Sequence, residues 1–178
     1  MTNRERVCAS LRHEQPDRTP YQIGFTQKAF AAMVQHYGGD GFLNLIDNAI
    51  HGVSANPGPR DMWLDDSTWQ DEFGVRWDRS IDRDIGNVCN CVLSDRSFKS
   101  LEIPDPRTSE KFAGMEEKVA AGKEAFVQFG IGFSLFERAW TLRGMENLFT
   151  DMIEAPEFVD ALLDSICDYN VALVERAV

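Results

Sequence analysis

The stretch AFVQFGI at residues 125–131 constrains the fold more than any other part of this chain. It is a short, mainly apolar run between two segments with helical periodicity, and Gly130 and Gly132 lie at its end. Such a run predicts a buried strand. A strand that follows one helix and leads into another indicates a βα architecture with parallel strand pairing.

The amino-terminal part of the chain predicts a similar order of elements. We expect a helix, a strand, a helix and a weaker helix over residues 3–13, 21–25, 26–37 and 42–46. Thr2 and Glu5 form a capping box for the first helix, and Thr26 caps the second. A loop with the sequence NPGP follows at 56–59.

The carboxyl-terminal part is predominantly helical. Thr108 or Ser109 is expected to cap a helix that ends at Gly122, and further helices are expected over 133–142 and 145–153. A last helix begins after Ala155, with Pro156 at its first position. The apolar stripe of this helix is Phe158 or Val159, Leu162, Leu163, Ile166 and Val171.

The middle of the chain, at 62–106, differs from its flanks, with short alternating segments near 72–78 and 87–93. In WQDEFGVRWDR, at 69–79, a period of two places Phe73, Val75 and Trp77 on one face. Glu72, Arg76 and Asp78 fall on the other. We expect a half-buried strand or hairpin arm that starts with a turn or bulge at Asp71, Glu72 and Gly74. The alternative is a pocket rim that includes Asp71, Glu72, Arg76 and Trp77.

Composition excludes several classes of function. The net charge of −11 disfavours binding to nucleic acid or to anionic lipid, and no apolar run is long enough for a membrane helix. We therefore expect a cytoplasmic protein. The four cysteines do not have structural zinc spacing, and the three histidines do not cluster, so no metal site is predicted from this chain.

Several separate stretches carry a family resemblance. The opening NRERVCASLRHEQPDRTPYQIGF resembles the start of the uroporphyrinogen decarboxylase superfamily, in which a helix of the form N-R-E-R-V precedes P-D-R-x-P and the first barrel strand. The resemblance continues in QDEFGVRWDR, IGFSLFERAWTLRGMENLFTDM and EAPEFVDALLDSICDYN. It implies the α/β fold of a (β/α)₈ TIM barrel, of which residues 1–178 form the amino-terminal half as a single partial domain, with 62–106 as an inserted β-hairpin region.

The superfamily contains tetrapyrrole decarboxylases and methyltransferases that use a corrinoid. The decarboxylases carry R-Q-A-G-R-Y after the first strand and a catalytic aspartate after the second. This chain has Gly24, Phe25, Thr26, Gln27 and Lys28 at the first place and AIHGVS, at 49–54, at the second. These departures favour the methyltransferase-like branch, and a decarboxylase acting on a tetrapyrrole is the alternative.

In the methyltransferases, zinc activates the acceptor thiol, and its ligands lie in the second half of the barrel. Zinc and a corrinoid are thus expected only for a full-length relative. A small-molecule substrate or a corrinoid protein is the expected partner, together with a second copy or another chain that completes the barrel. A further alternative is an inactive half-barrel that serves as a binding or oligomerisation module.

The resemblance implies a reacting face at the carboxyl ends of the strands. We expect His51 and Glu137 as the catalytic acid or base there, although a loop histidine and a helix N-terminal charge are the structural alternatives. The expected substrate-binding residues are Gly24, Phe25, Thr26, Trp77, Gly130, Gly132, Phe133 and Phe136.

Overall fold

A computed structural model of the chain describes residues 1–58 and 60–178. Position 59, in the predicted 56–59 loop, lies outside the described residues. The chain divides into two compact units, the first made of Met1–Ser54 with Gly114–Gly130 and the second of Ala55–Ala113 with Ile131–Val178.

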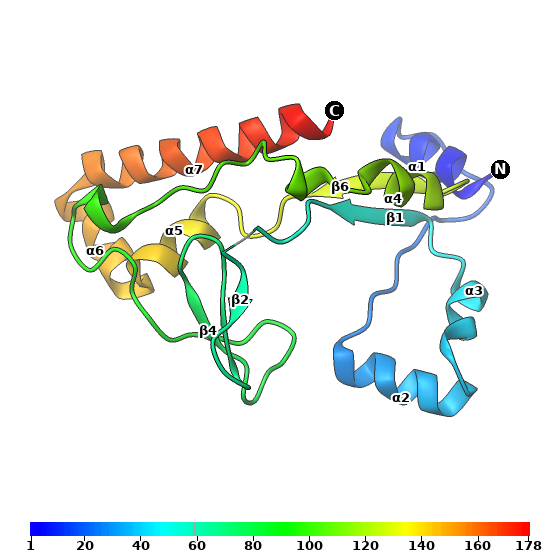
Figure 1. Ribbon diagram of the computed structural model, residues 1–178. Helices are drawn as coiled ribbons and strands as arrows, with labels where there is room; N and C mark the ends of the chain where they lie inside the picture. The colour runs from blue at the N-terminus through cyan, green and yellow to red at the C-terminus, as the bar shows by residue number, and fades with distance from the viewer. Residues whose placement is uncertain (59) are drawn as a thin grey trace. The chain divides into compact units, whose positions relative to one another are not determined.

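The first unit contains a parallel pair of strands. β1 (Ile50–Ser54) pairs with β6 (Phe126–Gly130) in a register that places His51 beside Val127 and Ser54 beside Gly130 (Figure 1). Because β1 and β6 run parallel, the chain must cross over from the end of β1 to the start of β6, and residues 55–125 make this connection. The predicted strand at 125–131 and its parallel pairing are confirmed.

Helices flank this pair of strands. α1 (Asn3–Leu11) contacts both strands, and its capping box is present, with Thr2 accepting from Glu5 N and Glu5 accepting from Thr2 N. α2 (Gln27–Tyr37) begins after the Thr26 cap and ends at Gly38, which has a φ of 72°. The remaining helical segments of this unit are η1 (Asp40–Phe42), α3 (Leu43–Ile46) and α4 (Met115–Ala121).

The predicted strand at 21–25 is wrong, since this segment is not assigned to a strand. It runs beside 48–49, where Ala49 N donates to Tyr21 O at 2.9 Å. The Asn48 side chain makes the next contacts, accepting from Ile23 N at 2.8 Å and donating to Ile23 O at 3.0 Å. An amide side chain thus bonds the backbone groups that a neighbouring strand would otherwise pair.

The second unit contains an antiparallel sheet in the order β2-β3-β4-β5. Its strands are short: β2 (Met62–Trp63), β3 (Thr68–Gln70), β4 (Arg76–Asp78) and β5 (Asn87–Val88). Phe73, Val75 and Trp77 are buried, as the alternation predicts. Only 76–78 of the predicted strand is extended, because 71–74 form a turn.

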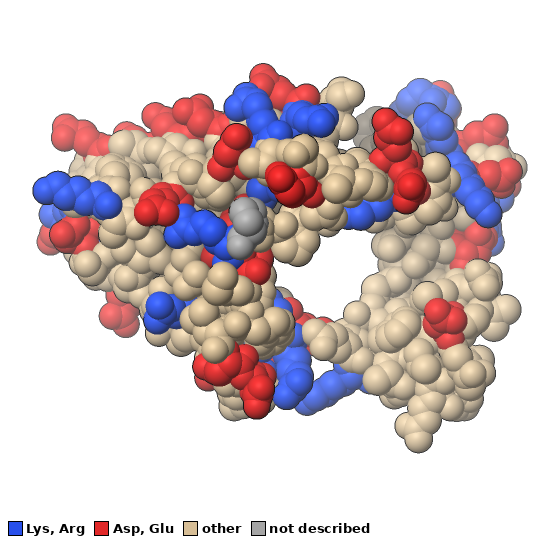
Figure 2. Space-filling view, viewed as in Figure 1, with Lys and Arg blue, Asp and Glu red and all other residues tan. Residues whose placement is uncertain are grey.

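Three helices complete the second unit: α5 (Phe136–Arg143), α6 (Met145–Glu154) and α7 (Pro156–Ala177), with Gly144 between α5 and α6. α7 packs on α5 and α6 through Val159, Leu162 and Ile166, which are buried. Its polar face is acidic, and Figure 2 shows Asp and Glu side chains gathered over this helix. Two short 3₁₀ segments, η2 (Phe98–Ser100) and η3 (Glu110–Phe112), lie in the loops.

A buried ion pair fastens α5 to α6. Arg143 Nε donates to Asp151 Oδ2 at 2.6 Å, and Arg143 Nη1 donates to Leu93 O at 2.8 Å. Arg96 Nε donates to the second oxygen of Asp151 at 2.8 Å. The side chains of Arg143 and Asp151 are almost fully buried, so this network also ties the 93–96 loop to the helices.

Three other expectations need correction. The helix expected from Thr108 or Ser109 to Gly122 is broken into η3 and α4, because Gly114 has a φ of 72° and interrupts it. Neither Thr108 nor Ser109 is its side-chain cap, since the residue that precedes α4 is Gly114. On α7, Val171 is 50% exposed and does not belong to the buried stripe, which continues instead through Tyr169, Ala172 and Leu173.

The observed fold class is mixed α/β, with one parallel pair of strands and one separate antiparallel sheet. These strands do not form a closed barrel among the described residues. Across residues 1–58 and 60–178, the longest apolar helical stretch falls short of what crossing a membrane requires.

Candidate functional site

Asp71 organises the turn in the DEFGV segment of the second unit. Its Oδ1 accepts from the backbone N–H groups of Phe73 and Val75, both at 3.0 Å, and its own N–H donates to Val75 O at 2.9 Å. Gly74 supplies the φ of 82° that this turn needs. The side chain of Asp71 is therefore a structural part of the hairpin and not an exposed rim carboxylate.

Arg138 of α5 neutralises this buried carboxylate. Its Nη1 donates to Asp71 Oδ2 at 2.6 Å, and both side chains are about a tenth exposed or less. The guanidinium also lies 4.2 Å from the ring centroid of Phe73 and 5.7 Å from that of Phe133. Cation–π contacts of this kind are strongest where water is excluded.

Glu72, next to Asp71, faces inward and not outward as the alternation predicts. Its Oε1 accepts from the Tyr169 hydroxyl at 2.6 Å, and its Oε2 lies 2.5 Å from Lys111 Nζ. Lys111, with a side chain only 3% exposed, also donates to Tyr169 Oη at 3.3 Å. The three side chains form a closed cluster, in which each group contacts both of the others.

The environment of this cluster shifts two ionisation equilibria. Burial, followed by the hydrogen bond to Glu72, raises the pKa of Tyr169 above that of an ordinary phenol. Burial also raises the pKa of Asp61, and the neighbouring Glu72 and Asp71 charges add to this effect. Asp61 accepts from Gly58 N and, at 3.0 Å, from Glu72 N, so it positions the backbone of Glu72.

A polar cavity of ≈ 50 Å³ lies beside these residues. Its walls combine carboxylate, phenol, guanidinium and amide groups with apolar rings, and the lining residues are Glu72, Phe73, Ile131, Phe133, Arg138, Ile166, Tyr169 and Asn170. The volume holds one or two water molecules or a small substituent. It is far smaller than the several hundred cubic ångströms typical of a pocket for a large organic ligand.

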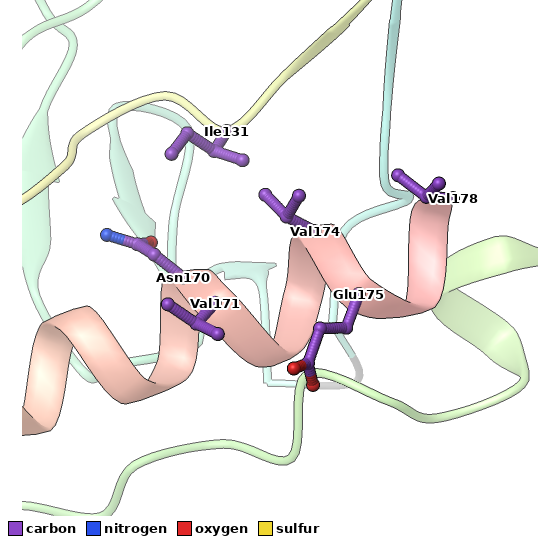
Figure 3. Close-up of a pocket in the computed structure, with 6 residues that line it drawn as sticks. All are labelled: Ile131, Asn170, Val171, Val174, Glu175 and Val178. Carbon is purple, nitrogen blue, oxygen red and sulfur yellow. The ribbon is translucent and has the colours of Figure 1, made fainter.

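An open apolar groove of ≈ 620 Å³ lies along the end of α7 in the same unit (Figure 3). Figure 3 shows Val174 and Ile131 approaching one another across it, with Asn170 and Glu175 at its edges. The exposed side chains of Val171 and Val178 complete the lining. The exposed surface of this groove is almost entirely apolar, which is typical of a surface that docks another molecule.

The first unit holds the predicted residues Gly24, Phe25, Thr26, His51 and Gly130. The Phe25 ring packs edge-on against Phe42 at 5.6 Å, and Thr26 caps α2. His51 Nε2 lies 2.9 Å from Lys118 O, and its ring approaches Gly122, so it is a half-buried histidine held by the backbone. Gly130 ends β6 and is exposed.

The second unit holds the others. It brings Trp77 and Phe133 together, with ring centroids 5.0 Å apart, and Phe133 lines the polar cavity. Phe136 is exposed and stacks on Phe149 of α6 at 6.0 Å, while Glu137 lies exposed on the first turn of α5. Gly132 has a φ of 54° in the loop that follows β6.

Sequence reasoning missed Lys111 and Tyr169, which contact Glu72, and it missed Arg138, which pairs with Asp71. A signal for Tyr169 exists, because it lies three residues after Ile166 and so shares the buried stripe of α7. Arg138 and Lys111 carry no comparable signal, since long basic side chains are usually exposed and only their tertiary partners reveal that they are buried.

The candidate metal ligands are scattered over the part of the chain that the structure describes. Among residues 1–58 and 60–178, histidine, cysteine and carboxylate side chains do not gather in groups of three that could hold a metal ion. The Cys91 thiol points at backbone oxygens, 3.3 Å from both Leu93 O and Arg143 O. Cys89 lies 3.4 Å from Arg76 O. These contacts assign both thiols to local structure.

Comparison with known proteins gives no further guide: no protein-family model, no curated protein and no solved structure matches this chain. The proposed function therefore depends on the sequence resemblance and on the geometry described above.

Proposed function

We propose that this chain is the amino-terminal part of a uroporphyrinogen-decarboxylase-like (β/α) barrel enzyme, whose chemistry is corrinoid-dependent methyl transfer. The parallel β1–β6 pair, with Gly130 as the last residue of β6 and Gly132 just after it, supports the barrel because parallel strands joined by helices are its repeating unit. In this proposal, further strands extend the pair, and the antiparallel sheet is an insertion in the barrel.

Residues of the stretches that carry the resemblance bond to one another within each unit. In the first unit, Arg6 of the opening helix donates to Asp17 of PDRTP through Nε at 2.7 Å and Nη2 at 3.1 Å. In the second, Asp71 of DEFGV pairs with Arg138 of SLFERAW. Residues that recur together in a family pattern are expected to have such mutual roles, so these bonds support the assignment.

The pairing of the buried cations favours methyl transfer over decarboxylation. The preference for methyl transfer rests on this observation. The two buried cations, Arg138 and Lys111, are already paired with Asp71 and Glu72 respectively. A tetrapyrrole with several carboxylates requires guanidinium partners that are not neutralised. A cavity of ≈ 50 Å³ also suits a small group and not a macrocycle.

The residues of this chain then have a supporting role in the proposed reaction. Asp71 and Arg138 fix the hairpin turn against α5, while Tyr169 and Lys111 hold the Glu72 carboxylate. When bound in a full-length relative, zinc activates a thiol for methylation and the corrinoid carries the methyl group. Among residues 1–58 and 60–178, the histidine, cysteine and carboxylate side chains do not form a group that fits a zinc ion.

Methyl transfer is tested with the product of the complete reading frame beside residues 1–178. Both are incubated with a methylated corrinoid and a thiol, and the thioether product and the corrinoid absorbance are followed. We expect methylation by the complete product and no stoichiometric zinc on residues 1–178. Conversion of uroporphyrinogen by the complete product, without thiol methylation, would instead establish the decarboxylase alternative.

A second candidate function is a binding or oligomerisation module, and the apolar groove on α7 favours it. A second copy of the chain covering Val171 and Val174 would remove these side chains from water. Sedimentation at increasing concentration tests this candidate. It predicts a dimer that V171S/V174S dissociates, whereas a monomer at all concentrations contradicts it.

A further inference from the structure

The two hairpin tips of the antiparallel sheet form one surface in the second unit. The register pairs Thr68 with Asp78, so the 64–67 loop between β2 and β3 and the 79–86 loop between β4 and β5 lie at the same end of the sheet. We call this end the hairpin-tip surface, and its residues are Trp63, Leu64, Asp65, Asp66, Ile81, Asp82, Asp84 and Ile85.

Arg79 holds the two loops together. Its backbone N–H donates to Ser67 O at 2.7 Å, and its Nε donates to Ile85 O at 3.2 Å. The guanidinium also lies 4.4 Å from the ring centroid of Trp69 and 5.7 Å from that of Trp63. A surface fixed at both loops loses little conformational entropy on binding, which favours recognition.

The apolar residues of this surface are unusually exposed. Ile81 is 82% exposed, Ile85 and Trp63 are each 54% exposed, and Leu64 is 43% exposed. Large apolar side chains grouped at one place and surrounded by polar residues mark an interaction site more often than scattered ones do. Met62 of the edge strand β2 extends the patch, with 47% exposure.

The same two loops carry four aspartates, Asp65, Asp66, Asp82 and Asp84. Backbone N–H groups of Ser67 and Thr68 lower the pKa of Asp65 to about 2, and the backbone N–H of Asp84 lowers that of Asp82. These carboxylates are therefore ionised at neutral pH. Asp66 and Asp84 add two more acidic groups, while the basic residues of the 79–86 loop are Arg79, which faces the tryptophans, and Arg83.

We propose that the hairpin-tip surface docks a partner protein through a basic segment in which lysine or arginine alternates with apolar side chains. The apolar residues of such a segment would cover Trp63, Leu64 and Ile81, and its cations would meet the aspartates. A second copy of this chain is a poorer occupant, because tip-to-tip pairing would bring aspartates against aspartates. This inference does not depend on the proposed enzymatic function.

The probe for this surface is a fluorescent peptide of alternating lysine and valine, with a glutamate–valine peptide as its counterpart. Binding is measured by anisotropy on residues 1–178 with the wild-type sequence and on the double variant I81S/D66N. The matched control is I153S/D160N, in which the replaced isoleucine is 85% exposed on α6 and the replaced aspartate is exposed on α7. All the replaced side chains are exposed, so we expect both variants to fold.

We expect the lysine–valine peptide to bind the wild-type chain and the control variant equally, and I81S/D66N about tenfold more weakly. Added salt should weaken the interaction, and the glutamate–valine peptide should not bind. Failure of the lysine–valine peptide to bind, or equal binding to both double variants, would overturn the proposal. A concentration-dependent dimer that only I81S/D66N dissociates would overturn it as well, since a second copy would then be the occupant.

Discussion

Arg138 on α5 and Asp71 in the hairpin turn form a buried ion pair, with 2.6 Å between Nη1 and Oδ2. Residues 67 positions apart in sequence are thus joined in the second unit. Asp71 bonds the turn backbone with one oxygen and Arg138 with the other, so the pair connects the local conformation of the turn to helix packing.

The first prediction concerns this pair. R138M should lower the free energy of unfolding by about 3–5 kcal/mol, because it leaves the Asp71 carboxylate buried without its cation. Urea denaturation measures the change. The control is R60Q, which removes the exposed pair of Arg60 with Glu102 and should cost less than about 1 kcal/mol. Equal changes in unfolding free energy for R138M and R60Q would show that the buried pair stabilises the chain no more than an exposed pair does.

The second prediction is a pH dependence that arises from Tyr169. Its pKa is raised in the folded chain, so its contribution to stability is fully present below the unfolded value of about 10 and is lost as pH rises above it. The difference in unfolding free energy between wild type and Y169F should therefore shrink between about pH 9 and pH 11. Y37F, at an exposed tyrosine, should not show this trend. A constant difference for Y169F would contradict the prediction.

The third prediction concerns Asp151. The hydrogen bond from Arg143, followed by that from Arg96, keeps the pKa of Asp151 below its usual value. Its stabilising contribution is present above the unfolded value of about 3.9 and is lost as pH falls below it. D151N should destabilise the chain by about 3–5 kcal/mol at neutral pH and flatten the acid limb of the stability curve.

Thermal unfolding at several pH values measures the effect of D151N, with D160N on the exposed face of α7 as the control. D160N should change stability by less than about 0.5 kcal/mol, as is usual for exposed positions. An acid limb that is unchanged in D151N would show that Asp151 does not determine it.

The fourth prediction tests the packing around Glu72. A Cβ atom at Gly58 would lie 2.5 Å from Glu72 Oε2, the oxygen that meets Lys111. G58A should therefore displace the carboxylate and cost about 1–3 kcal/mol of stability. G41A is the matched control, because a Cβ there meets no atom within 4 Å. The prediction fails if the two substitutions have the same effect in urea denaturation.

Much of the local structure was predictable, because it depends on neighbouring residues. The Thr2–Glu5 capping box, the Thr26 cap and Pro156 at the start of α7 each act within one turn of a helix. The alternation in WQDEFGVRWDR likewise predicted that Phe73, Val75 and Trp77 are buried. It was wrong for Glu72, since the turn at 71–74 removes that residue from the strand and lets it face inward.

The sequence alone determined most of the helices, the strand at β6 and the change to short hairpin strands in the middle of the chain, because periodicity and capping are local properties. Only the tertiary structure decided that Asp71 meets Arg138 and that Glu72 meets Lys111 and Tyr169. The partners in the second set are 39 and 97 positions from Glu72 in sequence. The reason is physical, because a charged side chain is buried only where folding brings an opposite charge next to it. No local sequence pattern specifies which distant residue supplies that charge.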